Sequence, residues 1–243
     1  MHKFLVIIFL SSNILLYNCA NNTGGEVANK DERFITYEVN LSTQTLKMYW
    51  KDDVNENFKN ASNLKSHLET KGEKLIFAVN GGMYNQQDSP QGLYIENGVV
   101  LAKLDTASSG FGNFYMQPNG VFYLSKNKQA TIVTTQNFKY STNIQYATQS
   151  GPMLLVDGVI NPLFGEKSEN LNIRNGVSIL PNGNAFFAQS TGEVNLYEFA
   201  EVFKDEGCEN ALYLDGYVSK TYLPEKKWEQ LDGDFAVMIA VTE

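Results

Sequence analysis

The feature that most constrains the fold is a series of short apolar runs separated by turns that contain glycine. Asn97-Gly98 and Asp157-Gly158 each lie between two such runs, and both dipeptides favour the two-residue turn of an antiparallel hairpin. Pro118-Asn119-Gly120 precedes a further pair of runs, and Pro181-Asn182-Gly183-Asn184 separates another pair. Because such turns pair neighbouring strands, the pattern predicts a mainly antiparallel sheet.

Further strands are predicted on both sides of these hairpins. Residues 34–41 alternate between apolar and polar side chains, and residues 45–50 follow after a Ser-Thr-Gln turn. Together they predict an N-terminal hairpin. Apolar runs at residues 75–79, 211–214 and 235–241 predict buried strands.

Only two segments have helical periodicity. Residues 63–71 place leucines on one face and end before a glycine, and residues 194–206 carry apolar side chains at i, i+3, i+4 and i+7. No linker divides the strands and helices. We therefore predict one α+β domain over residues 33–243, with a large, mainly antiparallel mixed sheet and few flanking helices.

The N-terminal segment has the features of a targeting sequence. A short basic start is followed by an apolar run over residues 4–16, which is too short to span a membrane and predicts a signal peptide over residues 1–18. The position of Cys19 predicts lipidation, although Asn18 replaces the small residue expected before it; the alternative is an ordinary signal peptide that contains Cys19. Residues 19–32 then form a flexible tether. The expected location is the bacterial cell envelope, lipid-anchored on the periplasmic or surface side.

Composition excludes several kinds of function. The formal charge is −8 and no basic cluster is present, so we expect no nucleic-acid partner. Once the predicted signal peptide is removed, His67 is the only histidine, and Cys208 is the only cysteine besides Cys19. A zinc site built from histidine and cysteine is excluded, and a serine triad would depend on a histidine on a predicted surface helix. Catalysis would therefore use carboxylates, Arg, Tyr, Asn, Ser or a hard cation bound by oxygen atoms.

Four segments share one pattern, in which an apolar run adjoins polar residues and glycine. They are Asn80-Gly81-Gly82-Met83-Tyr84, Gln149-Ser150-Gly151-Pro152, Arg174-Asn175-Gly176-Val177 and Leu214-Asp215-Gly216. Glycine allows the backbone to approach a ligand closely, and strand ends are common places for functional side chains. Each segment alone also fits a tight turn, and Arg174 alone also fits a structural ion pair with a carboxylate.

Together, these segments resemble those of the phosphodiester glycosidase family. The resemblance begins near Ile76 and extends to the C-terminus, and it includes Pro90-Gln91-Gly92-Leu93-Tyr94. Pro118-Asn119-Gly120-Val121-Phe122 resembles the bacterial branch of the family. The chain departs from the family at Tyr217 and Val218, which replace glycines after the Asp-Gly step, although Ser219 remains. This change alters the shape of the pocket, so the identity of the substrate does not transfer.

The resemblance implies hydrolysis of a sugar-1-phosphodiester at the bond between the anomeric carbon and a phosphate oxygen. It implies that Arg174 binds the phosphate and that Asp215 is a nucleophile, a base that activates water, or a ligand of a hard cation such as Ca²⁺ or Mg²⁺. The substrate-binding residues that it implies are Asn80, Gly81, Gly82, Gln149, Ser150, Gly151, Gly216 and Ser219.

A glycosidase normally uses two carboxylates, and the second one is not evident from the sequence. Asp88 and Asp105 are candidates on predicted loops, and Asp88 also fits a turn residue. Tyr84 fits either an aromatic side chain stacked on a sugar or a core or rim aromatic.

Two other functions remain open. A lipoprotein with polar strand-end loops could bind glycans without hydrolysing them. The replacement of glycines by Tyr217 and Val218 favours that alternative, whereas the retention of both Arg174 and Asp215 favours the enzyme. A metal-dependent phosphodiesterase would break the P–O bond, but two-metal sites usually use several histidine and aspartate ligands, and one histidine is available.

Overall fold

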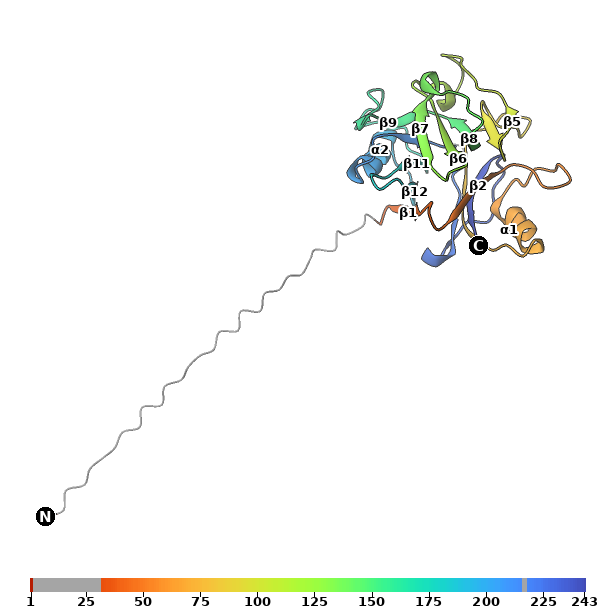
Figure 1. Cartoon of the computed structure of the whole chain (residues 1–243). Helices are drawn as coiled ribbons and strands as arrows, with labels where there is room; N and C mark the ends of the chain where they lie inside the picture. Colours follow the sequence, from red (N-terminus) through yellow and green to blue (C-terminus); the bar gives the residue numbers. More distant parts are fainter. Residues whose placement is uncertain (2–31, 216–217) are drawn as a thin grey trace. The chain divides into compact units, whose positions relative to one another are not determined.

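The computed structural model describes Met1, residues 32–215 and residues 218–243. The predicted signal peptide beyond Met1, the lipidation site Cys19, residues 20–31 of the tether, and Gly216 and Tyr217 lie outside the described residues. Residues 32–243 form one compact unit (Figure 1). No helix within the described part of the chain is long and apolar enough to cross a membrane.

The described strands form three sheets, and every pairing between them is antiparallel. The first sheet has the order β1 (Phe34–Val39), β12 (Ala185–Ser190), β11 (Asn175–Ile179), β13 (Ala211–Tyr213), β9 (Met153–Val156), β10 (Val159–Ile160). The second has the order β15 (Trp228–Glu229), β14 (Thr221–Leu223), β3 (Leu75–Asn80), β16 (Met238–Thr242), β2 (Thr45–Tyr49). The third has the order β5 (Val99–Ala102), β4 (Tyr94–Glu96), β8 (Ile144–Ser150), β6 (Gly120–Ser125), β7 (Ala130–Thr134).

Helices are few among the described residues. The α-helices are α1 (Ala61–Thr70) and α2 (Leu196–Asp205), and the 3₁₀ turns are η1 (Asn113–Tyr115), η2 (Thr135–Asn137) and η3 (Pro224–Lys226). The predicted α+β class with mainly antiparallel pairing is therefore confirmed. The prediction did not include the division of the strands among three sheets.

The four hairpins predicted from turn residues are confirmed, as β4–β5, β6–β7, β9–β10 and β11–β12. In the β4–β5 turn, Asn97 and Gly98 have φ values of 52° and 79°. Asp157 and Gly158 have φ values of 50° and 76° in the β9–β10 turn. Positive φ at both central positions is the requirement that favours Asn-Gly and Asp-Gly in such turns.

The predicted N-terminal hairpin is wrong. β1 pairs with β12 in the first sheet, whereas β2 pairs with β16 in the second. The turn between them closes with a hydrogen bond of 2.8 Å from Gln44 N to Asn40 O and directs the chain from one sheet to the other. Val39 on β1 and Met48 on β2 are both buried in the main core. The alternating pattern of these strands therefore reports burial against the core and not pairing with each other.

The main core lies where the three sheets face one another. Phe187 of the first sheet has its ring centroid 5.1 Å from that of Phe77 of the second sheet and 6.2 Å from that of Phe122 of the third. All three side chains are nearly or completely buried. Because one aromatic ring contacts both other sheets, packing in this core fixes the relative positions of the strand ends.

α2 covers the outer face of the first sheet and lies against β9 (Figure 1). Phe199 and Phe203 on its apolar face are completely buried. They pack so closely on β11 that a Cβ at Gly176 would lie 3.1 Å from each ring. The helix begins after Asn195, whose side chain accepts a hydrogen bond from Glu198 N, and the Glu198 side chain accepts one from Asn195 N. This capping box satisfies two backbone donors at the end of the helix.

Replacing Asn195 with alanine is expected to lower the free energy of unfolding by about 1–2 kcal/mol, because the capping box and a hydrogen bond to Glu166 O are both lost. Asn60 is a matched control, since its half-buried side chain caps α1 and, among the described residues, forms a hydrogen bond with Asn63 N only. We expect Asn60→Ala to cost about half as much. Urea unfolding of both variants measures the difference, and an equal cost would contradict the contribution of the capping box.

Candidate functional site

Strand ends from all three sheets meet at the segments singled out in the sequence. Asn80 ends β3, Ser150 ends β8 and Asn175 begins β11. Asn175 Nδ2 donates hydrogen bonds to Asn80 Oδ1 at 2.8 Å and to Asn80 O at 3.2 Å. Ser150 Oγ donates to Leu214 O at 3.1 Å. Buried hydrogen bonds therefore bring together four segments that are far apart in sequence.

Asn80 also positions the chain that follows Asp215. Its Nδ2 donates to Val218 O at 2.6 Å, and its Oδ1 accepts a hydrogen bond of 2.9 Å from Lys220 N. Ser219, which lies between them, donates from Oγ to Asp215 O at 3.2 Å. The asparagine at the end of β3 thus holds the backbone on the C-terminal side of the aspartate.

The strand register brings Arg174 and Asp215 together. β11 and β13 form an antiparallel ladder, and Leu214 N donates to Asn175 O at 3.1 Å just beyond the end of β13. Continued by one residue, this register places Arg174 opposite Asp215. Both residues are buried, with relative exposures of 1% and 5%. The two predicted catalytic residues are therefore cross-strand neighbours at the end of the first sheet.

The guanidinium of Arg174 is held in place by neutral groups. Nε donates to Val194 O at 2.9 Å, Nη1 to the Tyr213 hydroxyl at 3.0 Å, and Nη2 to Asn170 O at 2.7 Å and Asn170 Oδ1 at 3.3 Å. The guanidinium carbon also lies 5.4 Å from the centroid of the Tyr213 ring. Burial raises the pKa of Tyr213, so its hydroxyl remains protonated at neutral pH and accepts this hydrogen bond.

No carboxylate forms an ion pair with Arg174 within residues 32–215 and 218–243. The structural ion pair considered from the sequence is thus not found in the described part of the chain. Fully buried arginines are normally paired with an anion, because an uncompensated charge is costly in a medium of low dielectric constant. This arginine is therefore well suited to bind an anionic group supplied by a ligand.

A small cavity of about 90 Å³ lies beside Arg174. Its lining includes Met116, Asn170, Leu196 and Tyr197. The cavity therefore lies between the loop before β11, the start of α2 and the segment after η1. Two larger cavities, of about 440 and 190 Å³, are lined by none of the predicted site residues.

Gln149 makes all of its side-chain hydrogen bonds within the protein. Oε1 accepts from Leu93 N and Asp105 N, each at 3.0 Å. Nε2 donates to Asp105 O at 2.7 Å and to Thr135 Oγ1 at 3.1 Å. In this structure Gln149 connects β8 to the loop that carries Asp105, and its contact with substrate stays a prediction.

The glycines of the site segments are required by packing within the protein. A Cβ at Gly82 would lie 2.4 Å from a carbonyl oxygen of β8. A Cβ at Gly81 would lie 2.7 Å from Val237 Cγ1, and one at Gly151 would lie 2.7 Å from Asn119 Cβ. The sequence predicted that a ligand approaches the backbone closely at these glycines. In the structure the atoms close to the glycine backbone belong to the protein. Their contact with substrate also stays a prediction.

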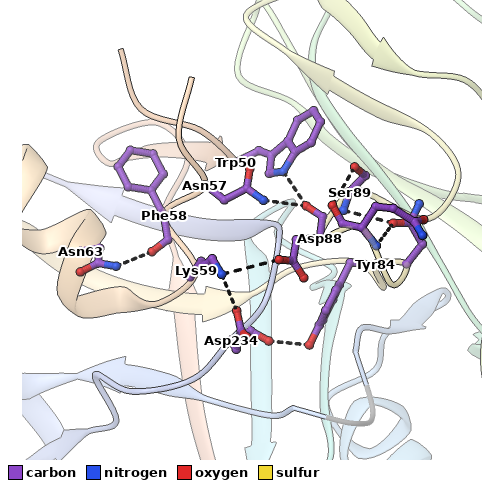
Figure 2. A network of polar contacts seen from close by, with 11 residues as sticks. Trp50, Asn57, Phe58, Lys59, Asn63, Tyr84, Asp88, Ser89 and Asp234 are labelled. Carbon is purple, nitrogen blue, oxygen red and sulfur yellow. Dashed lines mark hydrogen bonds and ion pairs between the residues drawn. The ribbon is translucent and has the colours of Figure 1, made fainter. Parts of the chain in front are cut away.

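Asp88 and Tyr84 belong to a polar network that joins three loops (Figure 2). Lys59 Nζ lies 3.6 Å from Asp88 Oδ2 and 3.8 Å from Asp234 Oδ1. The Tyr84 hydroxyl donates to Asp234 O, and Trp50 Nε1 donates to Asp88 O at 3.1 Å. Asp88 has a positive φ of 53°, as expected for the turn residue that the sequence allowed.

The described residues contain no group of three or more His, Cys, Asp or Glu side chains that could hold a metal ion. Asn80 Oδ1, on a predicted substrate-binding residue, already accepts two hydrogen bonds from the protein. His67 lies in α1, and its ring packs 5.0 Å from that of Phe58. The Cys208 thiol is buried, which raises its pKa, and donates to Ser178 Oγ. Neither residue is among those that hold Arg174 or Asp215.

Sequence reasoning gave no role to Asn175 or Tyr213, although each contacts a predicted site residue. Tyr213 lies two residues before Asp215, so strand alternation places both on the same face. That spacing was the available signal for Tyr213. The partner of Asn175 lies 95 residues away in sequence, so local sequence carries no signal for this contact.

Comparison with known proteins identifies the family. Residues 73–239 match the family model described as phosphodiester glycosidase, so the chain belongs to that family and the predicted family is confirmed. Membership of its bacterial branch stays a prediction. Over 188 residues the chain is 43% identical to the uncharacterized protein YigE of Escherichia coli, a match that covers 77% of this chain and 73% of YigE.

Solved structures share the fold at low sequence identity. One is the catalytic domain of zebrafish N-acetylglucosamine-1-phosphodiester alpha-N-acetylglucosaminidase, auto-inhibited by its pro-peptide, with a TM-score of 0.53 and 15% identity over 87% of this chain and 88% of that chain. Another is an exported protein of Burkholderia pseudomallei, with a TM-score of 0.57 and 9% identity over 86% of this chain and 73% of that chain.

Replacing Asn80 with alanine is expected to lower the free energy of unfolding by roughly 1–3 kcal/mol, because the part-buried donor Lys220 N loses its acceptor, whereas Asn175 Nδ2 keeps its hydrogen bond to the backbone carbonyl of residue 80. Asn143→Ala, at an exposed asparagine, is the control and should change stability by less than about 0.5 kcal/mol. Chemical unfolding measures both variants. Equal stability of the two would show that the Asn80 contacts do not hold the site together.

Proposed function

We propose that this member of the phosphodiester glycosidase family hydrolyses a sugar-1-phosphodiester, breaking the bond between the anomeric carbon and a phosphate oxygen. Family membership supports phosphodiester glycosidase-like activity in general. The observation that carries the proposal is the buried Arg174, which has only neutral hydrogen-bond partners in the described residues and lies in register with Asp215. A cation and a carboxylate side by side can bind a phosphate and act on the carbon attached to it.

Arg174 is the phosphate-binding group of the proposed site. Arginine presents planar donors that match phosphate oxygens, and the charge acts more strongly at a buried position than in water. The hydrogen bonds to Val194, Tyr213 and Asn170 fix its orientation before substrate arrives. With a formal charge of −8, the protein repels anions at long range, so attraction of phosphate depends on this local charge.

Asp215 is the carboxylate that acts at the anomeric carbon. The leaving group is a phosphate monoester, which is already a weak base, so it needs less protonation than the alcohol released by an ordinary glycosidase. Asp215 either attacks the anomeric carbon or removes a proton from the attacking water, and these alternatives correspond to retention and inversion of configuration. The hydrogen bond from Ser219 Oγ to Asp215 O fixes the backbone that carries it.

The substrate is a carbohydrate phosphodiester of the cell envelope or the extracellular space. This part of the proposal rests on the signal peptide and the lipidation site Cys19 predicted from the sequence. Contact with the membrane is through the lipid anchor alone. The alternative is a glycan-binding lipoprotein without activity, which the side chains at Tyr217 and Val218 favour.

Asp215→Asn is expected to reduce turnover of sugar-1-phosphodiesters by a factor of about 10³ or more, because a neutral amide can act neither as a nucleophile nor as a base. The experiment uses protein that starts after Cys19 and a panel that includes N-acetylglucosamine-1-phosphodiesters, the class named for the zebrafish enzyme. The reaction is run in ¹⁸O-water, with and without a chelator, and mass spectrometry locates the label.

Label in the free sugar, lost in the variant, would support cleavage of the C–O bond by Asp215. Label in the phosphate would contradict it and indicate a phosphodiesterase. If wild-type protein turns over no member of the panel but binds glycans as well as the variant does, the binding-protein alternative replaces this proposal.

Arg174→Lys is expected to weaken binding of sugar 1-phosphates by about tenfold or more, because lysine cannot reproduce the planar donors of the guanidinium. Binding of the corresponding sugars without phosphate should change much less. Isothermal titration with α-glucose 1-phosphate and N-acetylglucosamine 1-phosphate measures the effect. Arg33→Lys, at an exposed arginine, is the matched control and should bind like wild type. An equal loss for sugar and sugar phosphate would contradict the phosphate-binding role.

A further inference from the structure

The buried guanidinium of Arg174 retains one N–H donor for a ligand. An arginine side chain carries five N–H donors. Nε and Nη1 donate to Val194 O and the Tyr213 hydroxyl, and Nη2 donates to the backbone and side-chain oxygens of Asn170. The second N–H of Nη1 has no acceptor among the described residues. This donor and the positive charge of the side chain are therefore available to a phosphate oxygen.

The cavity beside Arg174 has mostly apolar walls. Among the described residues that line it, Arg174 alone is charged. The apolar and aromatic side chains of the wall are those of Met116, Leu163, Phe164, Leu196 and Tyr197. Burial and the nearby Glu166 carboxylate raise the pKa of Tyr197, so its ring carries no charge at neutral pH. The cavity therefore combines one cationic group with an apolar surface, which suits a ligand that has both a negative charge and an apolar part.

The polar side chains of the cavity wall already form hydrogen bonds within the protein. Asn170 Oδ1 accepts from Arg174 Nη2 at 3.3 Å and from Asn172 Nδ2 at 2.8 Å, and Ser168 Oγ accepts from Asn170 N at 3.3 Å. A sugar ring in this cavity would bury several hydroxyl groups against apolar side chains, which is unfavourable when the hydroxyls lack hydrogen-bond partners. An alkyl group has no such requirement.

The two ester bonds of the phosphate have different surroundings in the proposed site. The sugar ester must lie at Asp215, which follows β13 and is in register with Arg174. Asp215 is not among the residues that line the cavity, whereas Arg174 is. A phosphate bound to Arg174 therefore directs its sugar toward Asp215 and leaves the cavity to the alcohol on its second ester bond.

The size of the cavity limits how much of that alcohol it encloses. Its volume of about 90 Å³ is well below the roughly 300–1,000 Å³ of pockets that enclose a whole small-molecule ligand. Leu163 lines the cavity and is 63% exposed, so it also contacts solvent. A short alkyl segment fits inside the cavity, and a longer chain would continue over Leu163.

We propose that the alcohol on the second ester bond is aliphatic, so that the substrate class is the glycosyl phosphodiester of an alkyl alcohol. The inference rests on the proposed function and names the substrate class of the same site. Overall, the oxygen and one proton of water become the new hydroxyl on the anomeric carbon. The alkyl phosphate leaves with the electron pair of the broken C–O bond and takes up the other proton. Leu163 and Tyr197 are the residues that determine specificity for the alcohol.

The test compares methyl, propyl, glyceryl and octyl esters of N-acetylglucosamine 1-phosphate, each below its critical micelle concentration. Each methylene removed from water contributes about fourfold, so kcat/KM should rise about tenfold from methyl to propyl. The glyceryl ester has the carbon chain of the propyl ester and should react about tenfold more slowly. Leu163→Asn should lower kcat/KM for the octyl ester about threefold or more and leave the methyl ester unchanged. Leu101→Asn, at an exposed leucine of β5 outside the cavity lining, is the matched control and should leave both unchanged.

Titration calorimetry with methyl phosphate and octyl phosphate provides a second measurement, which needs no turnover. Octyl phosphate should bind to wild-type protein at least tenfold more tightly than methyl phosphate. Arg174→Lys should weaken binding of both compounds, because both carry the phosphate. Leu163→Asn should weaken binding of octyl phosphate alone.

The outcomes separate this inference from the function on which it rests. Turnover with equal kcat/KM for the methyl, propyl and octyl esters, or for the propyl and glyceryl esters, overturns the aliphatic alcohol and leaves the proposed function intact. A preference for long chains that Leu163→Asn does not reduce also overturns it, because the chain then binds elsewhere. If no ester is turned over, the proposed function fails and calorimetry decides. Equal affinity for the two phosphates then overturns the alkyl site, and a chain preference lost in Leu163→Asn supports it.

Discussion

The arrangement of the candidate site depends on the buried hydrogen bond between Asn175 and Asn80. It joins the first strand residue of β11 to the last residue of β3, and so connects the first sheet to the second. Both amides are nearly or completely buried, where an unmade hydrogen bond costs about 1–3 kcal/mol. Asn175 Oδ1 is itself buried without a hydrogen bond, so the other contacts of the pair must offset that cost. A buried polar atom without a hydrogen bond lowers stability, and such exceptions are most often found at functional sites.

The local parts of the fold could be predicted from the sequence, and the non-local parts could not. Asn97-Gly98 specifies its hairpin because positive φ values are needed at both positions, whatever the rest of the chain does. Phe199 and Phe203 predict α2 by their spacing. The pairing of β1 with β12 and of β2 with β16 has no such local signal. Burial on one face gives every strand the same alternation, so the pattern cannot show which strand is the partner.

In the candidate site, too, the residues could be predicted from the local sequence, but the contacts between them could not. Arg174 and Asp215 were singled out by residue type and neighbouring glycine, but their cross-strand relation comes from a ladder between segments almost 40 residues apart. Gln149 was singled out as a substrate-binding residue, and in the structure its amide forms hydrogen bonds with Leu93, Asp105 and Thr135 of the protein. Sequence can indicate that a polar residue beside glycine matters. The direction in which its side chain points depends on a tertiary neighbour that the local pattern does not contain.

Electrostatics favours a division of roles between Arg174 and Asp215. An acidic protein attracts no anion at long range, so phosphate binding depends on a local positive charge that water screens little. Arg174 supplies such a charge because its side chain is buried. The same burial strengthens the attraction between the guanidinium and the negative charge that develops on the leaving phosphate. In the proposed mechanism Arg174 therefore holds the leaving phosphate, and Asp215, on the segment that follows the neighbouring strand β13, acts at the anomeric carbon.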